Sequence, residues 1–295
     1  MLKNNVAIIG AGPSGVSAAL QLNKYGISPL IFECNEIGGL LRNAYSINNL
    51  PGYPNGIIGK KLAQRLEKHL LKSNNIIPEK VCIVQFSDDN FNIMTTSSVY
   101  QSDYLVVASG TKPVSFDSIT FSENQFQKIH YDIIRLFEEK KKKILIIGAG
   151  DAAFDYALSM SRFNEVLICN RKSTIKCNIQ LYQEAMKNKR ITYWKNSILK
   201  QIIYNEDGSM TALIQKNEIW LNYLCSHIIF AIGRIPNIDF LDKLDLNVKN
   251  KLIKSKRLFI IGDAANGNKR QTAICFGDGS RAAIDIYMNI CEKIK

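Results

Sequence analysis

The alternation of apolar and polar positions describes the same structural unit twice along the chain. Continuous apolar runs at Asn5–Ile9 and Lys143–Ile147 each predict a buried strand. Each strand leads into a glycine-rich turn, a stretch of helical composition and a second apolar strand. The helical stretches are Val16–Tyr25 and Phe154–Arg162, and the second strands are Pro29–Glu33 and Glu165–Cys169.

The second halves of the two units also correspond. Lys80–Thr96 and Ile198–Leu224 have the pattern of small antiparallel meanders with polar turns, and each precedes one more apolar strand that ends in glycine. These closing strands are Tyr104–Gly110 and His227–Gly233. Strands that alternate with helices predict an α/β fold with two Rossmann-like, three-layer dinucleotide-binding domains.

A short tail follows the second unit. Arg257–Ile261 predicts one more buried strand, and about Thr272–Ile294 predicts a long helix. The tail is too short for a domain, so we expect it to complete the first unit, with the second unit inserted. One domain would then comprise residues 1–112 plus 236–295 and the other residues 113–235, with breaks near Pro113 and Pro236.

The first glycine turn has the sequence and the context of a dinucleotide-binding motif. Gly10 permits the tight turn, Gly12 lets the backbone approach a pyrophosphate, and Gly15 allows helix and strand to pack closely. The start of the helix offers free N–H groups to phosphates. Glu33 ends the next strand, where its carboxylate can accept hydrogen bonds from ribose hydroxyls.

The second glycine turn, Gly148–Ala153, has alanine at the position that serves packing. The strand after it ends in Asn170 rather than in an acid. Three cations follow, and they are Arg171, Lys172 and Lys176. An acid would repel a 2′-phosphate whereas cations attract one, so the sequence favours NADPH over NADH; the alternative is that these are ordinary surface charges.

Two dinucleotide sites in one chain are most economically explained by one nicotinamide and one flavin, because hydride can pass from the first to the second. The motifs alone do not decide which site holds which cofactor.

Composition and charge exclude several other classes of protein. The 295 residues are 46% hydrophobic, and no apolar run approaches the roughly 18 residues of a membrane helix. The net charge of +12 suits an acidic partner, but no basic helix or aromatic–basic motif indicates nucleic acid. The seven cysteines include no Cys-x-x-Cys pair, so neither a metal site nor a dithiol motif is expected. Free thiols without a clear signal peptide point to the cytoplasm.

Together the motifs resemble those of the low-molecular-weight thioredoxin reductase family of flavoproteins, over essentially the whole chain. Any one of the matching stretches is weak, and together they are specific. They are Gly10–Gly15, Gly38–Leu41, Asn49–Pro54, Ala108–Gly110, Gly148–Ala153, Arg171-Lys172, Ala231–Asn237, Gly262-Asp263 and Arg270-Gln271. The resemblance implies FAD in the outer domain, NADPH in the inserted domain, and a homodimer.

The resemblance also implies which residues bind the cofactors. Asp263 would bond the ribityl chain, and Gln271 and Thr272 would begin a helix whose N–H groups face the flavin and stabilise negative charge on it. The implied FAD set is Gly10, Gly12, Pro13, Ser14, Gly15, Glu33, Gly39, Leu40, Asn49, Cys82, Ala108, Ser109, Gly110, Gly262, Asp263, Arg270, Gln271 and Thr272. The implied NADPH set is Gly148, Gly150, Asp151, Ala152, Arg171, Lys172, Lys176, Gly233 and Arg234.

One departure from the family shapes the expectation for the electron acceptor. Thioredoxin reductases of this family carry Cys-x-x-Cys just before the second glycine motif, where this chain has Ile129–Phe137 without a cysteine. This stretch, with Gly150–Asp155, is more similar to the thioredoxin-reductase-like ferredoxin–NADP reductases. We therefore expect hydride to pass from NADPH to the flavin and electrons to pass to an acidic carrier such as ferredoxin or flavodoxin.

Two alternatives stay open. One is a thioredoxin, disulfide or small-molecule reductase with an unconventional thiol, for which Cys275 is the candidate because it shares a helix face with Gln271. His130 lies near the position of the missing dithiol and is a further catalytic candidate, although single histidines are usually structural. The second alternative to a carrier reductase is a non-catalytic sensor that binds FAD and NADPH.

Tyr45 is a candidate to stack on the flavin, although a plain structural tyrosine is the simpler interpretation.

Overall fold

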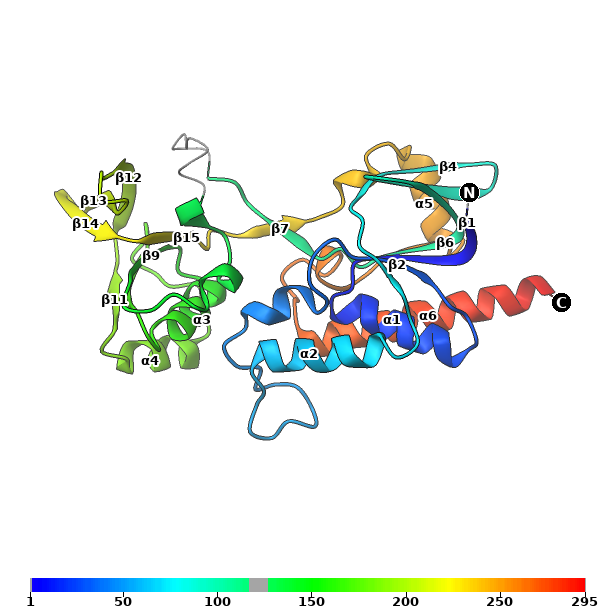
Figure 1. The fold of residues 1–295 in the computed structure, drawn as a ribbon, viewed down its shortest axis with the longest axis horizontal. Coiled ribbons are helices and arrows are strands. Elements are labelled where there is room, and N and C mark those ends of the chain that lie inside the picture. Colours follow the sequence, from blue (N-terminus) through cyan, green and yellow to red (C-terminus); the bar gives the residue numbers. More distant parts are fainter. Residues whose placement is uncertain (1, 117–126, 295) are drawn as a thin grey trace. The chain divides into compact units, whose positions relative to one another are not determined.

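The chain divides into two units (Figure 1). The computed structural model describes residues 2–116 and 127–294. The first unit comprises Met1–Arg42, Ser46–Lys112 and Ile235–Lys295, and the second comprises Asn43–Tyr45 and Pro113–Arg234. This division differs from the expected one at Ile235, which belongs to the first unit, and at residues 43–45.

Residues 43–45 were expected in the outer domain but belong to the second unit because their hydrogen bonds are made there. The Ile133 N–H donates to the Asn43 side chain (3.1 Å), and the Tyr45 N–H donates to the Asp155 carboxylate (3.0 Å). The Arg162 guanidinium lies 4.9 Å from the centre of the Tyr45 ring. Tyr45 therefore contacts Asp155 and Arg162 within the second unit, and its stacking on a flavin stays a prediction.

The first unit is built on a seven-stranded sheet in the order β3-β2-β1-β6-β5-β4, with β17 also paired to β6. Its strands are β1 (Leu2–Ile9), β2 (Leu30–Phe32), β3 (Ile76–Ile77), β4 (Val81–Ser87), β5 (Asn90–Thr95), β6 (Val99–Val107) and β17 (Leu258–Ile260). The early part of β6 is antiparallel to β5, and its later part is parallel to β17. The predicted meander and the predicted closing strand are therefore joined through one continuous strand.

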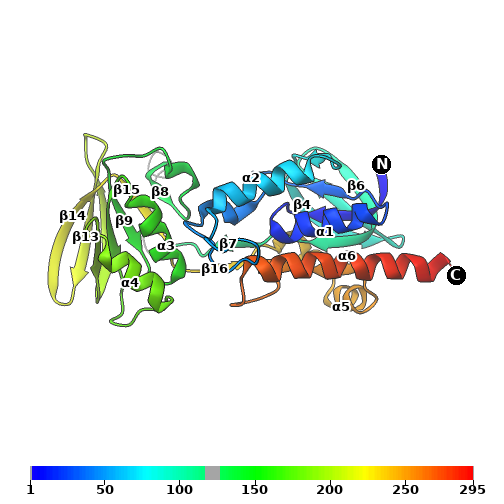
Figure 2. The same cartoon turned by 90° about the horizontal axis from the view of Figure 1, so that it is seen from below.

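Helices cover both faces of this sheet because side chains alternate along β1. Val6 and Ile8 pack beneath three helices, and Ala7 and Ile9 face the opposite side. The three helices are α1 (Pro13–Lys24), α2 (Gly59–Leu70) and α6 (Thr272–Ile294), which lie side by side in Figures 1 and 2. The opposite face is covered by α5 (Leu246–Lys254) and η4 (Asp239–Leu241), and side chains of β4 and β5 in the same sheet belong to this core. Two short helical turns complete the unit: η1 (Gly39–Asn43) lies between β2 and α2 in the chain, and η5 (Gly262–Ala264) lies between β17 and α6.

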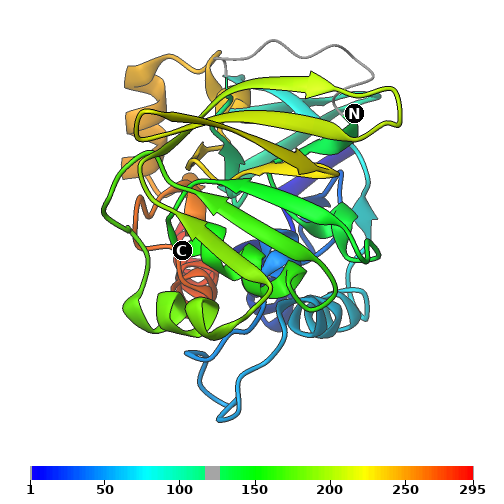
Figure 3. The ribbon, with the colours of Figure 1, turned by 90° about the vertical axis from the view of Figure 1, so that its left-hand side faces the viewer.

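The second unit repeats the plan with a five-stranded parallel sheet in the order β11-β10-β9-β15-β8. Its strands are β8 (Ile129–His130), β9 (Lys143–Ile147), β10 (Glu165–Cys169), β11 (Ile191–Trp194) and β15 (His227–Phe230). One face packs on α3 (Asp151–Met160), α4 (Ile179–Lys187) and η3 (Ile134–Leu136). The other face packs on a separate meander, β12 (Ser197–Tyr204), β13 (Met210–Lys216) and β14 (Ile219–Cys225), drawn yellow-green in Figure 3. The three layers agree with the predicted fold class.

The two chain segments that connect the units pair with each other as β7 (Thr111–Pro113) and β16 (Arg234–Pro236). The Val114 N–H donates to the Gly233 carbonyl, and the Asn237 N–H donates to the Gly110 carbonyl, each at 3.0 Å. Among the helices that the structure describes, none combines the length and the apolar character that a bilayer crossing requires.

Candidate functional site

The turn after β1 has the backbone geometry that a pyrophosphate needs. Gly10 has a φ of +99°, and a Cβ there would lie 2.5 Å from the Ala108 carbonyl oxygen. A Cβ at Gly15 would overlap the Gly10 carbonyl oxygen, whereas a Cβ at Gly12 would meet no described atom within 4 Å. Gly12 is also the N-cap of α1, and no side chain caps the N–H groups there. Of the three glycines, Gly12 alone faces open space, in front of free helix N–H groups.

Two predicted residues stand beside this turn. The Glu33 carboxylate accepts hydrogen bonds from the N–H groups of Ala11 (2.9 Å) and Asn35 (2.8 Å). A Cβ at Gly39 would lie 3.7 Å from the Cα of Gly12, so η1 crosses close to the turn. The arrangement places a carboxylate with spare acceptor capacity next to the helix N–H groups, as ribose and phosphate recognition require.

A second group of predicted residues gathers where α6 begins. The Asn49 side chain donates to the Gln271 side chain (2.7 Å), and Thr272 is the first residue of α6. The Asp263 carboxylate in η5 accepts from the Cys275 thiol (3.4 Å). The structure thus brings together residues that are more than 200 positions apart in the sequence.

Asp278 is a site residue that the sequence analysis missed. One of its carboxylate oxygens accepts from the Gly262 N–H (3.2 Å) and from the Asn266 side chain (2.6 Å). These bonds hold the turn that carries Asp263. The available signal was the i, i+3 spacing of Asp278 from Cys275 on the predicted helix, which places both side chains on one face.

For the remaining residues of the predicted FAD set, the structure gives mainly their positions in the fold. They are Pro13 and Ser14 in the first turn of α1, Leu40 in η1, Ser109 and Gly110 after β6, and Arg270 before α6. The Ser109 hydroxyl donates to the Asn237 carbonyl (2.6 Å), so it fixes the returning chain. Cys82 is an exposed residue of the outermost strand β4, and its thiol donates to the Lys80 carbonyl (3.6 Å). Its contacts do not reach the glycine turn.

The second glycine turn repeats the geometry of the first. Gly148 has a φ of +132°, and a Cβ there would overlap the Ala231 carbonyl oxygen. A Cβ at Gly150 would meet nothing within 4 Å in the described chain, and Gly150 is the N-cap of α3 without a side-chain cap. Asp151 and Ala152 begin α3, and Gly233 and Arg234 stand at the start of β16. The Asp151 carboxylate accepts from the Asn178 N–H (2.7 Å), which holds the following loop against the turn.

The cationic loop after β10 is organised by Asn170, to which the sequence analysis gave no role. Its side-chain oxygen accepts from the Lys172 N–H (3.1 Å), and its amide donates to the Thr174 carbonyl and the Tyr193 hydroxyl (both 2.8 Å). Arg171, Lys172 and Lys176 are exposed, and within the described part of the chain none forms an ion pair with an acid. The loop therefore offers three uncompensated cations beside the second glycine turn, where a 2′-phosphate would lie.

Neutralising two of these cations should affect the two nicotinamide cofactors differently. In an Arg171→Ala/Lys172→Ala variant we expect KM for NADPH to rise at least about tenfold, because the loss of even one charge-assisted hydrogen bond costs roughly 1.5–3 kcal/mol. KM for NADH should stay within a factor of about two, because NADH carries no 2′-phosphate. Steady-state kinetics with both cofactors measure the difference, and an equal rise for both would remove these residues from cofactor selection.

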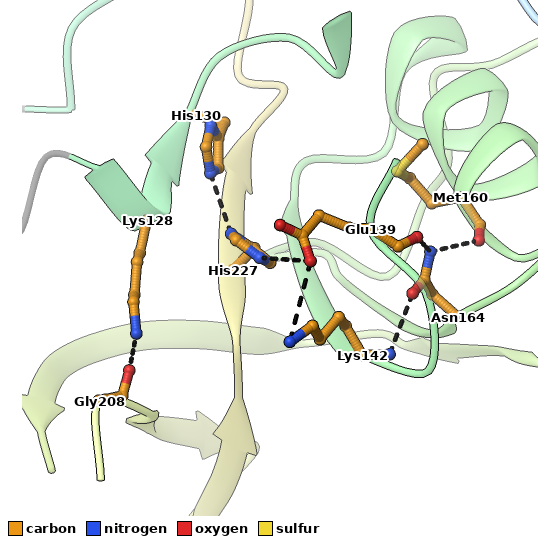
Figure 4. A network of polar contacts seen from close by, with 8 residues as sticks. All are labelled: Lys128, His130, Glu139, Lys142, Met160, Asn164, Gly208 and His227. Atoms are coloured by element: carbon orange, nitrogen blue, oxygen red, sulfur yellow. Dashed lines mark hydrogen bonds and ion pairs between the residues drawn. The ribbon is translucent and has the colours of Figure 1, made fainter. Parts of the chain in front are cut away.

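The catalytic candidate His130 belongs to a polar network in the second unit (Figure 4). His130 Nε2 lies 3.2 Å from His227 Nδ1, and His227 Nε2 lies 3.8 Å from a Glu139 oxygen, which also lies 3.8 Å from Lys142 Nζ. His227 is the first residue of β15, and the His130 ring reaches back to it from the end of β8, where His130 is level with Ile229. The contact with His227 starts from the amino end of β15, whereas ligands bind at the carboxyl edge of such sheets. This contact and the burial of the His130 ring favour a structural role for His130.

A fall in pH should lower the stability of the second unit through this histidine network. Burial, with help from His227 and Arg135, lowers the pKa of His130 from 6.5 to about 4. The unfolded chain therefore binds more protons between pH 6.5 and 4, and stability falls as the pH falls through this window. We expect a His130→Gln variant to lose less thermal stability than the wild type across it.

The difference between variant and wild type is the relevant quantity, because other groups titrate nearby. Burial raises the pKa of Asp155 to about 6, which acts in the opposite direction as the pH falls. Thermal unfolding midpoints of both proteins at several pH values give the comparison. Parallel curves would show that His130 does not titrate as its burial implies.

The cysteines are all unpaired in the structure. Cys275 is buried, and burial together with the Asp263 carboxylate raises the pKa of its thiol to about 12. Burial likewise raises the pKa of the Cys169 and Cys225 thiols to about 12. A thiol with such a pKa is almost fully protonated at neutral pH and is a poor nucleophile. No group of three or more His, Cys, Asp or Glu residues that could hold a metal occurs in the described ranges.

Comparison with known proteins places this geometry among flavoproteins. The profile of the family described as pyridine nucleotide-disulphide oxidoreductase matches residues 4–279. The chain is 26% identical over 309 residues to a thioredoxin reductase of Chlamydia pneumoniae, covering 97% of this chain and 98% of the relative. It is 28% identical over 318 residues to a thioredoxin reductase of Buchnera aphidicola subsp. Schizaphis graminum, covering 98% of each chain.

Solved structures share the fold. The Lactococcus lactis thioredoxin reductase in its FR conformation superimposes with a TM-score of 0.86 at 23% identity, covering 98% of this chain and 99% of that one. A bacillithiol disulfide reductase of Bacillus cereus gives a TM-score of 0.76 at 21% identity, covering 97% of this chain and 99% of that one.

Proposed function

The chain belongs to the pyridine nucleotide-disulphide oxidoreductase family, and from this premise we propose that it reduces an acidic one-electron carrier of the ferredoxin or flavodoxin type at the expense of NADPH. The coarser activity follows from the family: the protein is a flavin-dependent oxidoreductase of the thioredoxin reductase-like kind, with FAD and NADPH as its cofactors. The identity of the electron acceptor is the proposal.

The residues of both glycine turns fit the two dinucleotides. At Gly12 and Gly150 the backbone leaves room for a pyrophosphate in front of uncapped helix N–H groups. Glu33 adds a ribose acceptor in the first unit, and Arg171 and Lys172 add cations for a 2′-phosphate in the second. The first unit therefore suits FAD and the second suits NADPH.

The chain's own residues position the cofactors rather than transfer protons. With both cofactors bound, the nicotinamide would supply a hydride and the flavin would pass its two electrons singly to two molecules of carrier, with NADP⁺ and one proton as the other products. The start of α6, held by the bond between Asn49 and Gln271, presents N–H groups that stabilise negative charge beside it.

The observation that carries the choice of acceptor is the state of the cysteines. Disulfide reduction by a relay needs two thiols that can form a disulfide with each other, and the seven cysteines are all free and without a Cys-x-x-Cys pair. Cys275 is the one cysteine beside the start of α6, and its raised pKa keeps it protonated. A carrier that accepts single electrons needs no such relay. Unpaired thiols also suit a reducing compartment such as the cytoplasm.

A thioredoxin is the second candidate acceptor, because the relatives above are thioredoxin reductases. Thioredoxin reduction by this chain would have to use a thiol in an unfamiliar position. A Cys275→Ser variant separates the two candidates, since it should keep full activity toward a one-electron carrier. Loss of that activity in a variant that still binds FAD would indicate a thiol route.

The test is a screen of acceptors against the NADPH-reduced protein under anaerobic conditions. Ferredoxin, flavodoxin, thioredoxin and low-molecular-weight disulfides are each mixed with the protein in a stopped-flow instrument. We expect ferredoxin or flavodoxin to be reduced faster than the protein reacts with oxygen, and thioredoxin to be reduced slowly or not at all. Fast reduction of thioredoxin alone would replace the proposal.

A further inference from the structure

We propose that the outward face of α2 is the surface on which the acidic electron carrier docks; this inference rests on the proposed function and names where that partner binds. The surface consists of Lys60, Lys61, Arg65 and Lys68, here called the α2 ridge, and all four side chains are exposed. No basic helix was expected from the sequence, and the ridge corrects that expectation. The missed signal was the helical spacing of the four cations within residues 60–68.

The helix separates its charges from its apolar side chains. Residues 61, 65 and 68 share a face because they are three and four positions apart. Leu62, Ala63 and Leu70 lie on the opposite, buried face. The one acid of α2, Glu67, forms an ion pair with Arg42 (2.9 Å) at the flank of the helix and leaves the ridge positive.

Three of the ridge cations are not neutralised by neighbouring acids of the described chain. Within the described part of the chain, Lys61, Arg65 and Lys68 take part in no ion pair with a carboxylate. By comparison, Lys112 pairs with Asp239 and Lys256 pairs with Asp285 elsewhere in the same unit. Three adjacent uncompensated cations produce a local positive potential that attracts an acidic protein over about a Debye length.

The ridge is connected to the predicted flavin site through two contacts within the first unit. A Cβ at Gly38 would lie 2.5 Å from the Ala63 side chain, so the buried face of α2 packs directly on the turn that leads into η1. The Arg65 guanidinium lies 5.5 Å from the centre of the Tyr53 ring and donates to its hydroxyl (3.3 Å). Tyr53 lies between η1 and α2 in the chain, and the segment that joins these two elements is drawn as a projecting blue loop in Figure 1.

The same loop reaches the start of α6. Asn49 bonds to Gln271, and Tyr53 is four residues further along the chain, a span of at most about 14 Å. A carrier seated on the ridge and on Tyr53 would therefore be close to the edge of the site at which Gln271 and Thr272 stand. Electron transfer requires that the carrier bind close to the flavin, whereas a charged surface that serves only solubility could lie anywhere on the protein.

The chemistry of the ridge favours an acidic protein over other anions. Its cations stand singly along a helix and include one arginine, whose planar guanidinium suits carboxylate pairs. One large apolar side chain, Leu71 at the end of α2, is exposed beside the ridge, and a single exposed apolar side chain is normal on a protein surface rather than a sign of membrane insertion. Charge complementarity of this kind raises the rate of association and sets the orientation of transient complexes.

The test compares two charge reversals of equal size in the full-length protein. The first variant is Lys61→Glu/Lys68→Glu. The matched control is Lys251→Glu/Lys254→Glu on α5, which covers the opposite face of the same sheet; both lysines are exposed and without ion pairs in the described chain. The dissociation constant for an acidic ferredoxin is measured by titration calorimetry at low salt, without NADPH.

We expect the ridge variant to bind ferredoxin at least about tenfold more weakly than the wild type and with a shallower dependence on salt. The control should stay within about twofold. NADPH-driven ferricyanide reduction should be unchanged in both variants, because this small acceptor needs no docking surface. KM for ferredoxin should rise only in the ridge variant.

Three results would overturn the inference. They are equal weakening in both variants, no weakening in the ridge variant, and binding of a short DNA duplex to the wild type as tightly as ferredoxin. Failure of the proposed function looks different: the wild type would then bind ferredoxin through the ridge without reducing it.

Discussion

A Gly12→Val variant is expected to fold normally and to purify without FAD. The backbone at Gly12 has φ −72° and ψ −175°, which valine adopts without strain, and an added Cβ meets no described atom within 4 Å. The side chain would instead occupy the space in front of the α1 N–H groups. We expect FAD affinity to fall at least about a hundredfold, or roughly 2.7 kcal/mol. Absorbance of the purified protein and calorimetric titration with FAD measure the loss.

The matching change at the second turn serves as the control. Gly150→Val adds the same side chain at the corresponding position, where a Cβ also meets open space. This variant should keep its FAD and lose affinity for NADPH instead. Loss of FAD in Gly150→Val, or normal FAD content in Gly12→Val, would contradict the assignment of the cofactors to the two units.

A Gly279→Ala variant is expected to be strongly destabilised. A Cβ there would overlap the Ser14 carbonyl oxygen and would lie 2.8 Å from the Ala18 N–H nitrogen, so α6 and α1 would have to separate. The separation would also weaken the bond from the Ser17 hydroxyl to the Phe276 carbonyl (2.8 Å). Overpacking of this kind costs about 3 kcal/mol. At roughly 2–4 °C per kcal/mol, the thermal unfolding midpoint should fall by about 6–12 °C.

Gly277 supplies the control on the same helix. It is exposed, and a Cβ there meets nothing within 4 Å in the described chain. Gly277→Ala should therefore stabilise the protein by up to about 1 kcal/mol, the difference in helix propensity. If both alanine variants unfolded at the same temperature, the close approach of α1 and α6 would not be what requires glycine at position 279.

Local patterns predicted the elements that build the two cofactor sites. A strand, a glycine turn, a helix and a second strand follow each other within about thirty residues, and all the interactions that define them are local. The conformations of Gly10 and Gly148 are examples, because a tight turn with positive φ demands glycine whatever the distant chain does. The helix at Thr272–Ile294 agrees with its predicted bounds.

Contacts between distant segments could not be predicted. His130 and His227 are 97 positions apart, and nothing in either local sequence indicates that their rings meet. The assignment of residues 43–45 to the second unit depends on the Asp155 carboxylate and on the Ile133 N–H, which the local pattern does not reveal. The homodimer stays a prediction from the resemblance.

The basic α2 ridge was missed for a different reason. A search for nucleic-acid motifs looks for dense runs of cations, such as Lys140–Lys143, whereas the cations of α2 are spread over nine positions and meet only on the helix surface. Helical spacing, rather than local density, was the informative signal.

Anaerobic titration of the purified protein with NADPH, followed in the visible flavin band, tests whether the chain houses FAD and NADPH in two clefts built on one plan. We predict a yellow protein that bleaches rapidly and completely at one NADPH per bound FAD. A colourless protein that takes up no FAD after refolding with excess cofactor would contradict the assignment, and a yellow protein that NADPH does not bleach within minutes would contradict the enzymatic role.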